Sequence, residues 1–525
     1  MSCPDEHIKQ KMCQRQIPGL AVRLYHAGGR AFEKEWGYAD INTKSIISNE
    51  TIFRVGCLTK PVIAVTILTL AEEGFFDLDD NIIDYLPSLA GSNLPYFSEI
   101  TIAHLLAHRS GIARGTYYED APDIDKLLTE IAKTEIAFKP GTAYKYSNWG
   151  YLLLGEICSA VTGTAVTDYC TKRILAPLQM NDTFFQTKDI SLNNMAKGYW
   201  DNWHFGFPDL SQPLVESKWF PIAPSASGLV CTPDDFGKFI RAITQIDSGD
   251  GGKVLPANIF KHIFTRIADK GAHKFTSLCL YSEEIDHRDV WYFPGTNSGF
   301  SAYFFYIPSL GISGVAMANR TACNNELREL LELIISSVWP DIPASCLTRR
   351  PIPFEGEFAD SSGEILHLKI GPENGNQVVL NKKITPLLFC SPRNYFQLDG
   401  NYRQHMLRIH TKMGEIYEVT NGARSYRPAS SKKAEKNGTT NWLSAFTGIF
   451  EYPAFGRAEV LHRGHKLYLN FGVIYETVLT NIEQNTFRQT KGPFAGECIQ
   501  FAPPAGSGAN SPYFILNGMK FKRFD

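Results

Sequence analysis

The stretch that most limits how this chain can fold runs from residue 61 to residue 70 and reads PVIAVTILTL. Its apolar side chains lie on nearly every side of a helix, and Gly74 follows as a C-terminal stop. A helix that is apolar all round must be enclosed by other elements, so the pattern predicts a central helix over Pro61–Glu73. The chain has 525 residues and 44% hydrophobic content, which is enough for such a core and for roughly three domains.

A small nucleophile stands where this helix begins. Cys57 precedes Lys60 by three residues, and residues three apart lie on the same side of a helix. Lys60 could then take or stabilise the thiol proton, while the positive N-terminus of the helix also favours a thiolate. The alternative is inert packing, which is the usual fate of a cysteine in an apolar setting. Cys57 and Lys60 are therefore candidate catalytic residues.

The first part of the chain alternates strand-like and helical segments. GLAVRLYHAG, residues 19–28, reads as a strand, and residues 149–161 read as a helix. FSAYFFYIPSLGISGVAMAN, residues 300–319, predicts a hairpin that turns at Pro308–Gly311. We expect the early and late strands to share one antiparallel sheet flanked by helices. Four prolines in VWPDIPASCLTRRPIP break any continuing helix and place the end of this domain, 1–345, near residue 345.

The remainder of the chain repeats a short pattern. FEGEF at 354–358, followed by EILH at 364–367, recurs as FTGIF at 446–450, followed by EVLH at 459–462. The polar stretch PASSKKAEKNGTTN separates the copies. We interpret this as two small antiparallel β-barrel domains, 346–430 and 442–525; a chance match of short segments is the alternative.

Charge and composition exclude several classes of partner. The chain has 52 basic and 54 acidic residues with no long run of one sign, which predicts no binding of nucleic acid or of an anionic membrane. A small-molecule or peptide substrate fits better. The polar N-terminus and the lack of a long apolar stretch predict a cytoplasmic protein, and eleven cysteines without paired spacing suit a reducing compartment. Assembly into a homo-oligomer is left open.

One histidine pair has a spacing that can hold a metal. His104 and His108 stand four residues apart and would share a helix face. No acidic or sulfur ligand follows at a matching spacing, so a structural role near the helix end is the preferred interpretation. We expect no metal and no other cofactor.

The segment around Cys57 resembles the active-site motif of the serine β-lactamase and penicillin-binding-protein superfamily. In that motif Ser-x-x-Lys opens a buried helix; in FRVGCLTKPVIA the place of the serine is held by Cys57. A native thiol and a replaced serine would give the same sequence. Six further stretches follow in family order within residues 15–335: LDDNIIDYLP, ITIAHLLAHRSGI, KPGTAYKYSNWGYLLLGEI, ILAPLQMNDTFF, SASGLVCTPDDFGKFI and PGTNSGFSAYFFYIP. The resemblance implies an α/β (α+β) β-lactamase-like catalytic domain, in the branch of D-aminopeptidases (peptidase family S12), where two β-barrels can follow the catalytic domain.

The second family motif, Tyr-x-Asn, is met by Tyr146 and Asn148. By this resemblance Tyr146 would relay protons, and a nearby lysine could hold it as a phenolate that acts as general base. Asn148 would orient the substrate. Without the neighbouring matches, a tyrosine packed beside a helix start would be the default interpretation.

The third family motif is broken. Relatives carry Lys-Thr-Gly or His-x-Gly beside the site, whereas this chain has Phe293, Pro294 and Gly295 there. Phe293 can neither donate a hydrogen bond nor carry charge, but an oxyanion hole formed by the N–H groups of Cys57 and Thr296 needs no particular side chain. Phe293, Gly295, Thr296 and Asn148 are therefore the candidate substrate-binding residues. His287, six residues upstream, is expected on the surface.

Three functions remain open on these residues. The leading hypothesis is an acyl-enzyme hydrolase of a peptide or amide, in which Cys57 attacks the carbonyl while Lys60 and Tyr146 manage the proton. A thiol nucleophile also suits a biosynthetic acyltransferase or peptide cyclase that takes a thioester donor. Because two of three motifs depart from the family pattern, a catalytically inactive binding protein is the third.

Overall fold

The computed structural model describes most of the chain. The described residues are 5–89, 96–115, 125, 128, 131, 136–186, 194–200, 213–217, 224–244, 254–271, 274–321, 323–342, 346–347, 354–359, 364–370, 377–380, 383–391, 394–397, 406–412, 415–421, 424–428, 441–452, 456–463, 466–470, 476–483, 485–489, 498–503, 510–516 and 519–523. They fall into two compact units, the first built from Met1–Trp200 and Leu214–Thr348, and the second from Asp201–Pro213 and Arg349–Asp525.

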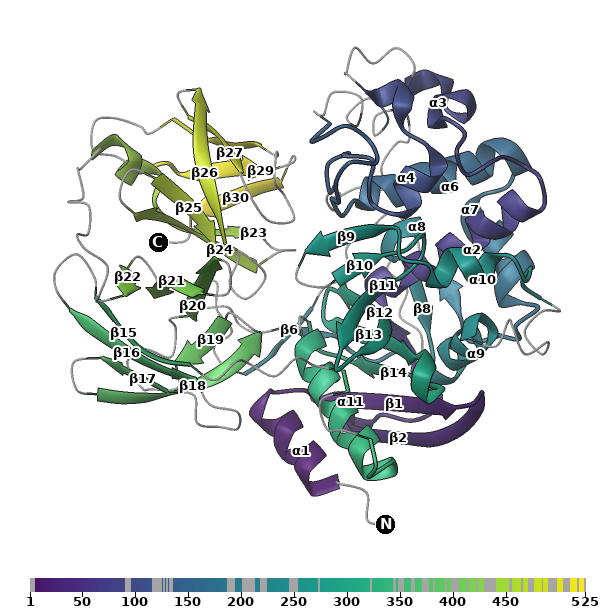
Figure 1. Ribbon diagram of the computed structural model, residues 1–525, viewed down its shortest axis with the longest axis horizontal. Coiled ribbons are helices and arrows are strands. Elements are labelled where there is room, and N and C mark those ends of the chain that lie inside the picture. The colour runs from purple at the N-terminus through teal and green to yellow at the C-terminus, as the bar shows by residue number, and fades with distance from the viewer. Residues whose placement is uncertain are drawn as a thin grey trace. The chain divides into compact units, whose positions relative to one another are not determined.

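The first unit is built on a nine-stranded antiparallel sheet (Figure 1). The strand order is β3-β2-β1-β14-β13-β12-β11-β10-β9. The strands are β1 (Gly19–His26), β2 (Gly29–Asp40), β3 (Ser45–Ile46), β9 (Ala268–Gly271), β10 (Lys274–Thr276), β11 (Tyr281–Ile285), β12 (Arg288–Asn297), β13 (Phe300–Ile307) and β14 (Ile312–Ala318). β1 pairs with β14, so the early and late strands share one sheet as the sequence predicts. The predicted hairpin is also confirmed, because β13 and β14 are joined by the turn η6 (Pro308–Leu310) and Gly311 at φ +61°.

Helices and short strands complete this unit. They are α1 (Asp5–Gln14), α2 (Thr59–Glu72), α3 (Ile82–Tyr85), α4 (Ile102–Leu106), α6 (Asn148–Thr162), α7 (Val166–Cys170), α8 (Pro224–Ser227), α9 (Pro233–Thr244), α10 (Ile259–Phe264) and α11 (Asn324–Val338), with β4 (Phe53–Arg54), β5 (Phe184–Phe185), β6 (Tyr199–Trp200), β7 (Val215–Glu216) and β8 (Leu229–Cys231). α9 and α11 pack on the sheet, whereas α2 packs against α6, α8 and α10. Among the described residues, no helix is long and apolar enough to cross a membrane.

The all-apolar helix is enclosed as predicted. Every residue of α2 from Thr59 to Leu70 is buried. The helix starts two residues earlier than predicted, because a single 3₁₀ turn, η1 (Gly56–Leu58), leads directly into it. The predicted helix at 149–161 is α6, which ends at Gly163 in the left-handed conformation. Both helices therefore lie where their apolar patterns place them.

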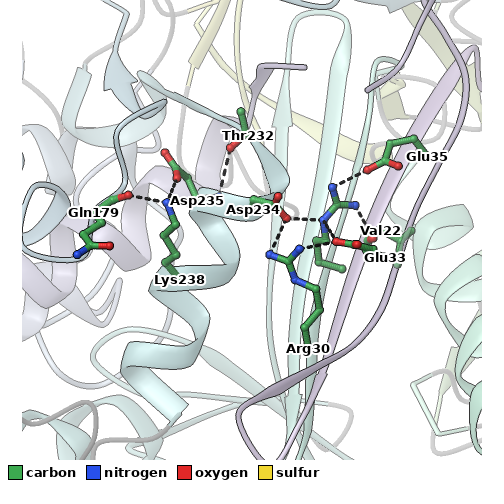
Figure 2. Close-up of polar contacts among 10 residues, drawn as sticks. Val22, Arg30, Glu33, Glu35, Gln179, Thr232, Asp234, Asp235 and Lys238 are labelled. Atoms are coloured by element: carbon green, nitrogen blue, oxygen red, sulfur yellow. Dashed lines mark hydrogen bonds and ion pairs between the residues drawn. The ribbon is translucent and has the colours of Figure 1, made fainter. Parts of the chain in front are cut away.

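A cluster of charged side chains around buried Arg23 joins α9 to strands β1 and β2 (Figure 2). Arg23, on β1, is fully buried. Its guanidinium contacts Asp234 at the start of α9 at 2.6 Å and Glu35 on β2 at 2.5 Å. Arg30 bridges to Asp234 at 3.2 Å from the solvent side. These pairs fix the helix to two strands that lie far from it in the sequence.

The second unit is β-barrel structure. Its strands are β15 (Phe354–Ala359), β16 (Ile365–Ile370), β17 (Gln377–Leu380), β18 (Lys383–Ser391), β19 (Asn394–Gln397), β20 (Met406–Lys412), β21 (Glu415–Asn421), β22 (Arg424–Pro428), β23 (Gly448–Tyr452), β24 (Gly456–Arg463), β25 (Lys466–Asn470), β26 (Glu476–Glu483), β27 (Thr486–Gln489), β28 (Cys498–Phe501), β29 (Tyr513–Leu516) and β30 (Met519–Arg523). Antiparallel pairing closes β15–β22 on itself, and likewise β23–β30. The two copies of the repeated sequence form the first hairpin of each barrel, which is β15–β16 in one and β23–β24 in the other. Both barrels lie in one compact unit, so the division into separate domains at 346–430 and 442–525 stays a prediction.

Candidate active site

Two glycines bring β12 against the turn that carries Cys57. Gly56 has φ +55°, and a Cβ there would lie 2.4 Å from the carbonyl oxygen of Thr296. A Cβ on Gly295 would lie 2.1 Å from the carbonyl oxygen of Val55. Neither position can accept a side chain without moving main-chain atoms. The backbone of Thr296 is therefore held beside the residue that precedes Cys57.

Cys57 lies half-buried and is hydrogen-bonded to the second motif. The Oη of Tyr146 donates to Sγ of Cys57 at 2.9 Å. The hydroxyl of Ser227, at the end of α8, lies 3.9 Å from the same sulfur. Two hydroxyl groups that approach one sulfur stabilise its anionic form.

Lys60 is fully buried one helical turn further on. Its Nζ donates to Oδ1 of Asn148 at 2.8 Å and to the carbonyl oxygen of Ala226 at 2.9 Å. It also lies 4.7 Å from the centre of the Tyr146 ring. Within the described parts of the chain, no carboxylate forms a salt bridge with Lys60. A buried ammonium with neutral oxygen partners releases its proton more easily than one paired with an acid.

The pKa shifts of the three groups agree with this geometry. Burial is the largest influence on Lys60 and lowers its pKa from 10.5 to about 8, against the attraction of Cys57. Burial opposes ionisation of Cys57, but the charge of Lys60 and the hydrogen bond from Tyr146 outweigh it, so the thiol pKa lies below its usual 9.0. Burial and the charge of Cys57 raise the pKa of Tyr146 well above 10.0. The site therefore favours a thiolate beside an ammonium and a neutral phenol, not the phenolate expected from the sequence.

The Tyr146–Asn148 segment is fixed by its place at the start of α6. Ser147 caps the helix, accepting from the N–H of Gly150 at 2.9 Å, and its hydroxyl donates to the carbonyl oxygen of Ala113 at 2.7 Å. The backbone N–H of Ser147 donates to Nδ1 of His108 at 3.2 Å. These bonds orient the two motif side chains on either side of Ser147.

The two histidines of the 104–108 stretch do not share a helix face. α4 ends at Leu106, and His108 has φ +57°, outside the helical region. The predicted i, i+4 arrangement is wrong because the chain turns at this point. His104 instead completes a capping box with Thr101, and the ring of His108 packs 4.5 Å from that of Tyr146. Both histidines have structural contacts, and one of them supports the site.

The segment at the third family motif, Phe293–Thr296, contributes its backbone to the site and the side chain of Phe293 to the core. Phe293 is 1% exposed and stacks on Tyr281, with ring centres 4.7 Å apart. The ring is therefore packed inside the protein, and a substrate-binding role for Phe293 stays a prediction. Thr296 is half-buried, and its hydroxyl accepts from the side chain of Asn324 at 2.7 Å. His287 lies at the exposed turn between β11 and β12, as expected of a surface residue.

Sequence reasoning missed three parts of the site. Ser227 and the carbonyl of Ala226 come from α8, and Arg114 lies with its guanidinium 5.0 Å from the centre of the Tyr146 ring. Ala226 and Ser227 lie in SASGLVCTPDDFGKFI, which matches the family only in its order, and Arg114 lies two residues beyond the end of ITIAHLLAHRSGI. Small polar residues in a run with glycine give no spacing signal, because their approach to Cys57 is set by tertiary packing.

Comparison with known proteins agrees with this architecture. Protein flp of Staphylococcus aureus (strain MW2) is 28% identical over 324 residues, a match that covers 60% of this chain and 62% of that protein's length. The octameric penicillin-binding protein homologue from Pyrococcus abyssi superposes with a TM-score of 0.57 at 19% identity, over 80% of this chain and 98% of that one. The D-amino acid amidase from Ochrobactrum anthropi SV3 gives a TM-score of 0.54 at 21% identity, over 64% of this chain and 99% of that one.

These structural likenesses concern the fold. The family assignment rests on the sequence, since the model of the Beta-lactamase family matches residues 4–337. That range contains every residue of the site, from Cys57 on η1 to Thr296 on β12. The chain therefore belongs to the Beta-lactamase family.

Proposed function

We propose that this protein is an acyl-enzyme hydrolase that cleaves a peptide or a small amide through Cys57. The observation that carries the proposal is the hydrogen bond of 2.9 Å from the neutral phenol of Tyr146 to the sulfur of Cys57, with buried Lys60 beside the pair. An amide leaves only when its nitrogen gains a proton, so a proton donor at the nucleophile is what amide cleavage needs. The likeness to a D-amino acid amidase supports an amide substrate.

The reaction follows from these positions. The thiolate of Cys57 attacks the carbonyl carbon, and the C–S bond forms while the carbonyl π electrons move to oxygen. The N–H groups of Cys57 and Thr296 are the expected donors to that oxygen. As the C–N bond breaks, Tyr146 gives its proton to the leaving nitrogen and recovers one from Lys60. Water then attacks the thioester, Lys60 takes the proton, and the acid leaves as the thiolate is restored.

Transfer from a thioester donor is the second candidate. The observation that favours it is that Lys60 and the hydrogen bond from Tyr146 lower the pKa of the Cys57 thiol, because a thiol that ionises more easily exchanges more readily with thioesters. The acyl group would then pass to an amine of the acceptor, or of the same molecule in a cyclisation. A thiolate leaving group needs no proton, so this function depends little on Tyr146.

Intact-mass measurement with wild type, Cys57→Ala and Tyr146→Phe tests the proposal. We expect a D-aminoacyl amide and a matching thioester to acylate the wild type and to leave Cys57→Ala unmodified. Tyr146→Phe should slow amide cleavage by a factor on the order of 10²–10⁴ and thioester acylation far less. Equal labelling of Cys57→Ala would exclude Cys57 as the nucleophile.

The other outcomes separate the alternatives. Much faster turnover of the thioester, unaffected by Tyr146→Phe, would support acyl transfer in place of hydrolysis. Absence of any adduct with amides, esters and thioesters would support a binding protein without catalysis.

A further inference from the structure

The end of β12 that carries Thr296 is paired with another strand on one side only. β12 pairs with β11 up to Tyr292, whereas its pairing with β13 continues to Asn297. In the described part of the sheet, residues 293–297 therefore have a strand partner in β13 alone. The glycine contacts bring the Cys57 turn close to this end, but close contact does not fix the direction of an N–H group, whereas a hydrogen bond does.

The β12–β13 hairpin is tied to the segment that leads into α11. The hydroxyl of Thr321 accepts from the N–H of Gly299 at 2.5 Å and donates to the carbonyl oxygen of Asn297 at 3.2 Å. The hydroxyl of Ser301 accepts from the N–H of Cys323 at 3.0 Å. These bonds fix the backbone of the hairpin against the start of the helix.

Asn324, at the start of α11, is the residue that reaches Thr296 itself. Its Nδ2 donates to Oγ1 of Thr296 at 2.7 Å. Side chains alternate along a strand, so the side chain of Thr296 lies on the face opposite that of Gly295, which meets the Cys57 turn. Asn324 therefore holds Thr296 from the side of the sheet away from the nucleophile.

The other end of the Asn324 amide is poorly served. Its Oδ1 is buried and accepts no hydrogen bond from the described residues. A buried polar atom without a partner lowers the stability of the folded state, which offsets what the bond to Thr296 contributes. An apolar side chain of similar size should therefore cost little stability at this position, so a role in the reaction can be measured apart from folding.

We propose that Asn324 is a positioning residue, which aims the backbone N–H of Thr296 at the oxygen of the acyl group by fixing the Thr296 hydroxyl. The inference rests on the proposed function, because that N–H matters only when a carbonyl is attacked. A β-branched side chain is stiff at χ1, so a fixed hydroxyl also fixes the orientation of its own backbone. Negative charge collects on the oxygen as the carbon becomes tetrahedral, and a donor aligned in advance lowers the barrier.

Two reactions of Cys57 separate this role from a general effect on the site. p-Nitrophenyl acetate acylates the thiolate through a tetrahedral oxyanion with loss of p-nitrophenolate, whereas iodoacetamide alkylates it at a saturated carbon with loss of iodide and forms no oxyanion. The acylation rate is the release of p-nitrophenolate in excess of that in Cys57→Ala, because Cys13 and Cys498 are exposed as well. The alkylation rate is read from the mass of the Cys57 peptide.

The measured quantity is the ratio of acylation to alkylation. We expect Asn324→Leu to lower it about tenfold, since loss of a whole oxyanion donor costs a factor of roughly 10²–10³ and a misaligned donor costs less. Thr296→Val removes the hydroxyl but keeps the N–H, so it should lower the ratio equally, and the double variant should be no slower than either single one. Thr296→Ser keeps the hydroxyl and should keep most of the wild-type ratio.

Ser301→Ala is the matched control, because it removes the other hydroxyl that holds the start of α11 and leaves the bond between Asn324 and Thr296 in place. It should change the ratio less than about twofold. An unchanged ratio in folded Asn324→Leu, or an equal fall in Ser301→Ala, would overturn the positioning role. If Asn324→Leu does not fold, an unchanged ratio in Thr296→Val would overturn it as well. A wild type that is alkylated at Cys57 but acylated no faster than Cys57→Ala would overturn the proposed function, and the positioning role with it.

Discussion

Arg23 and Lys60 are two fully buried cations among the described residues of the first unit, and they behave in opposite ways. Arg23 meets the carboxylates of Asp234 and Glu35 at 2.6 and 2.5 Å. Burial opposes its charge, but these carboxylates more than offset that cost and raise its pKa above the usual value for an arginine. Lys60 meets an amide oxygen and a backbone carbonyl, and burial lowers its pKa to about 8. Similar burial yields a permanent charge in one region and an exchangeable proton in the other.

The comparison shows that the partners, and not the depth, decide what a buried cation does. Carboxylates around Arg23 make it a structural connection between β1, β2 and α9 (Figure 2). The nearest group that can carry a negative charge beside Lys60 is the thiol of Cys57, not a carboxylate. Lys60 is therefore available for proton transfer at the site. Substitutions at the two cations should therefore separate stability from reactivity.

The largest effect is expected from Arg23→Met. The substitution removes the cation that Glu35 and Asp234 share, both of them only about a quarter exposed, and leaves Asp234 with Arg30 alone. We expect the free energy of unfolding to fall by about 3 kcal/mol, measured by denaturant titration, with no change in the rate of Cys57 alkylation. Arg30→Met is the control at the half-exposed rim of the same cluster, and about 1 kcal/mol or less should be lost there. An equal loss in both variants would show that burial of Arg23 is not what matters.

Lys60→Met should show the reverse pattern. Without the ammonium, Cys57 loses the positive charge that lowers its pKa, so less of the thiol is ionised at pH 7 and alkylation by iodoacetamide slows by a factor on the order of ten to a hundred. The free energy of unfolding should stay level or increase, because a buried charge without a carboxylate partner is replaced by an apolar side chain of similar length. If Lys60→Met lowers the free energy of unfolding as much as Arg23→Met does, the partners of a buried cation do not decide its role.

The pH dependence of stability should give the smallest effect. Between about pH 8 and 10.5 the unfolded chain keeps the Lys60 proton while the folded protein has released it. The unfolded state then binds more protons, so the free energy of unfolding gains a contribution that rises with pH across this window. Arg23 contributes nothing there, because its pKa is higher in both states. Parallel denaturant titrations from pH 7 to 10.5 should show a shallower rise in Lys60→Met than in the wild type; equal slopes would argue against a lowered Lys60 pKa.

Much of the fold could be predicted from local sequence. The all-apolar run fixed the place of α2, and the alternation around Pro308 gave the β13–β14 hairpin. Cys57 and Tyr146 were paired only through the family resemblance, and the structure brings them to 2.9 Å. Such signals work because periodicity and motif order reside in neighbouring residues.

What escaped prediction depends on packing between distant segments. Ser227 is 170 positions from Cys57, and nothing in its own neighbourhood marks it. The spacing of His104 and His108 suggested a shared helix, but the backbone of His108 is in the left-handed conformation. An i, i+4 pattern of residue types carries no information about such a backbone angle. Phe293 occupies a motif position, yet its ring is 1% exposed and stacks on Tyr281. The state of Tyr146 likewise follows from burial and a neighbouring charge, which no spacing records.

The glycine contact between the Cys57 turn and β12 has a consequence for how members of this family can diversify. Gly56 and Gly295 hold the two main chains together without help from any side chain. We therefore expect position 293 to exchange lysine, histidine and phenylalanine over evolutionary time while the main chain of Thr296 stays in register with the nucleophile. The main chain at Thr296 and the side chain at position 293 would then vary independently. A descendant could change its substrate preference while the backbone geometry beside Cys57 is kept.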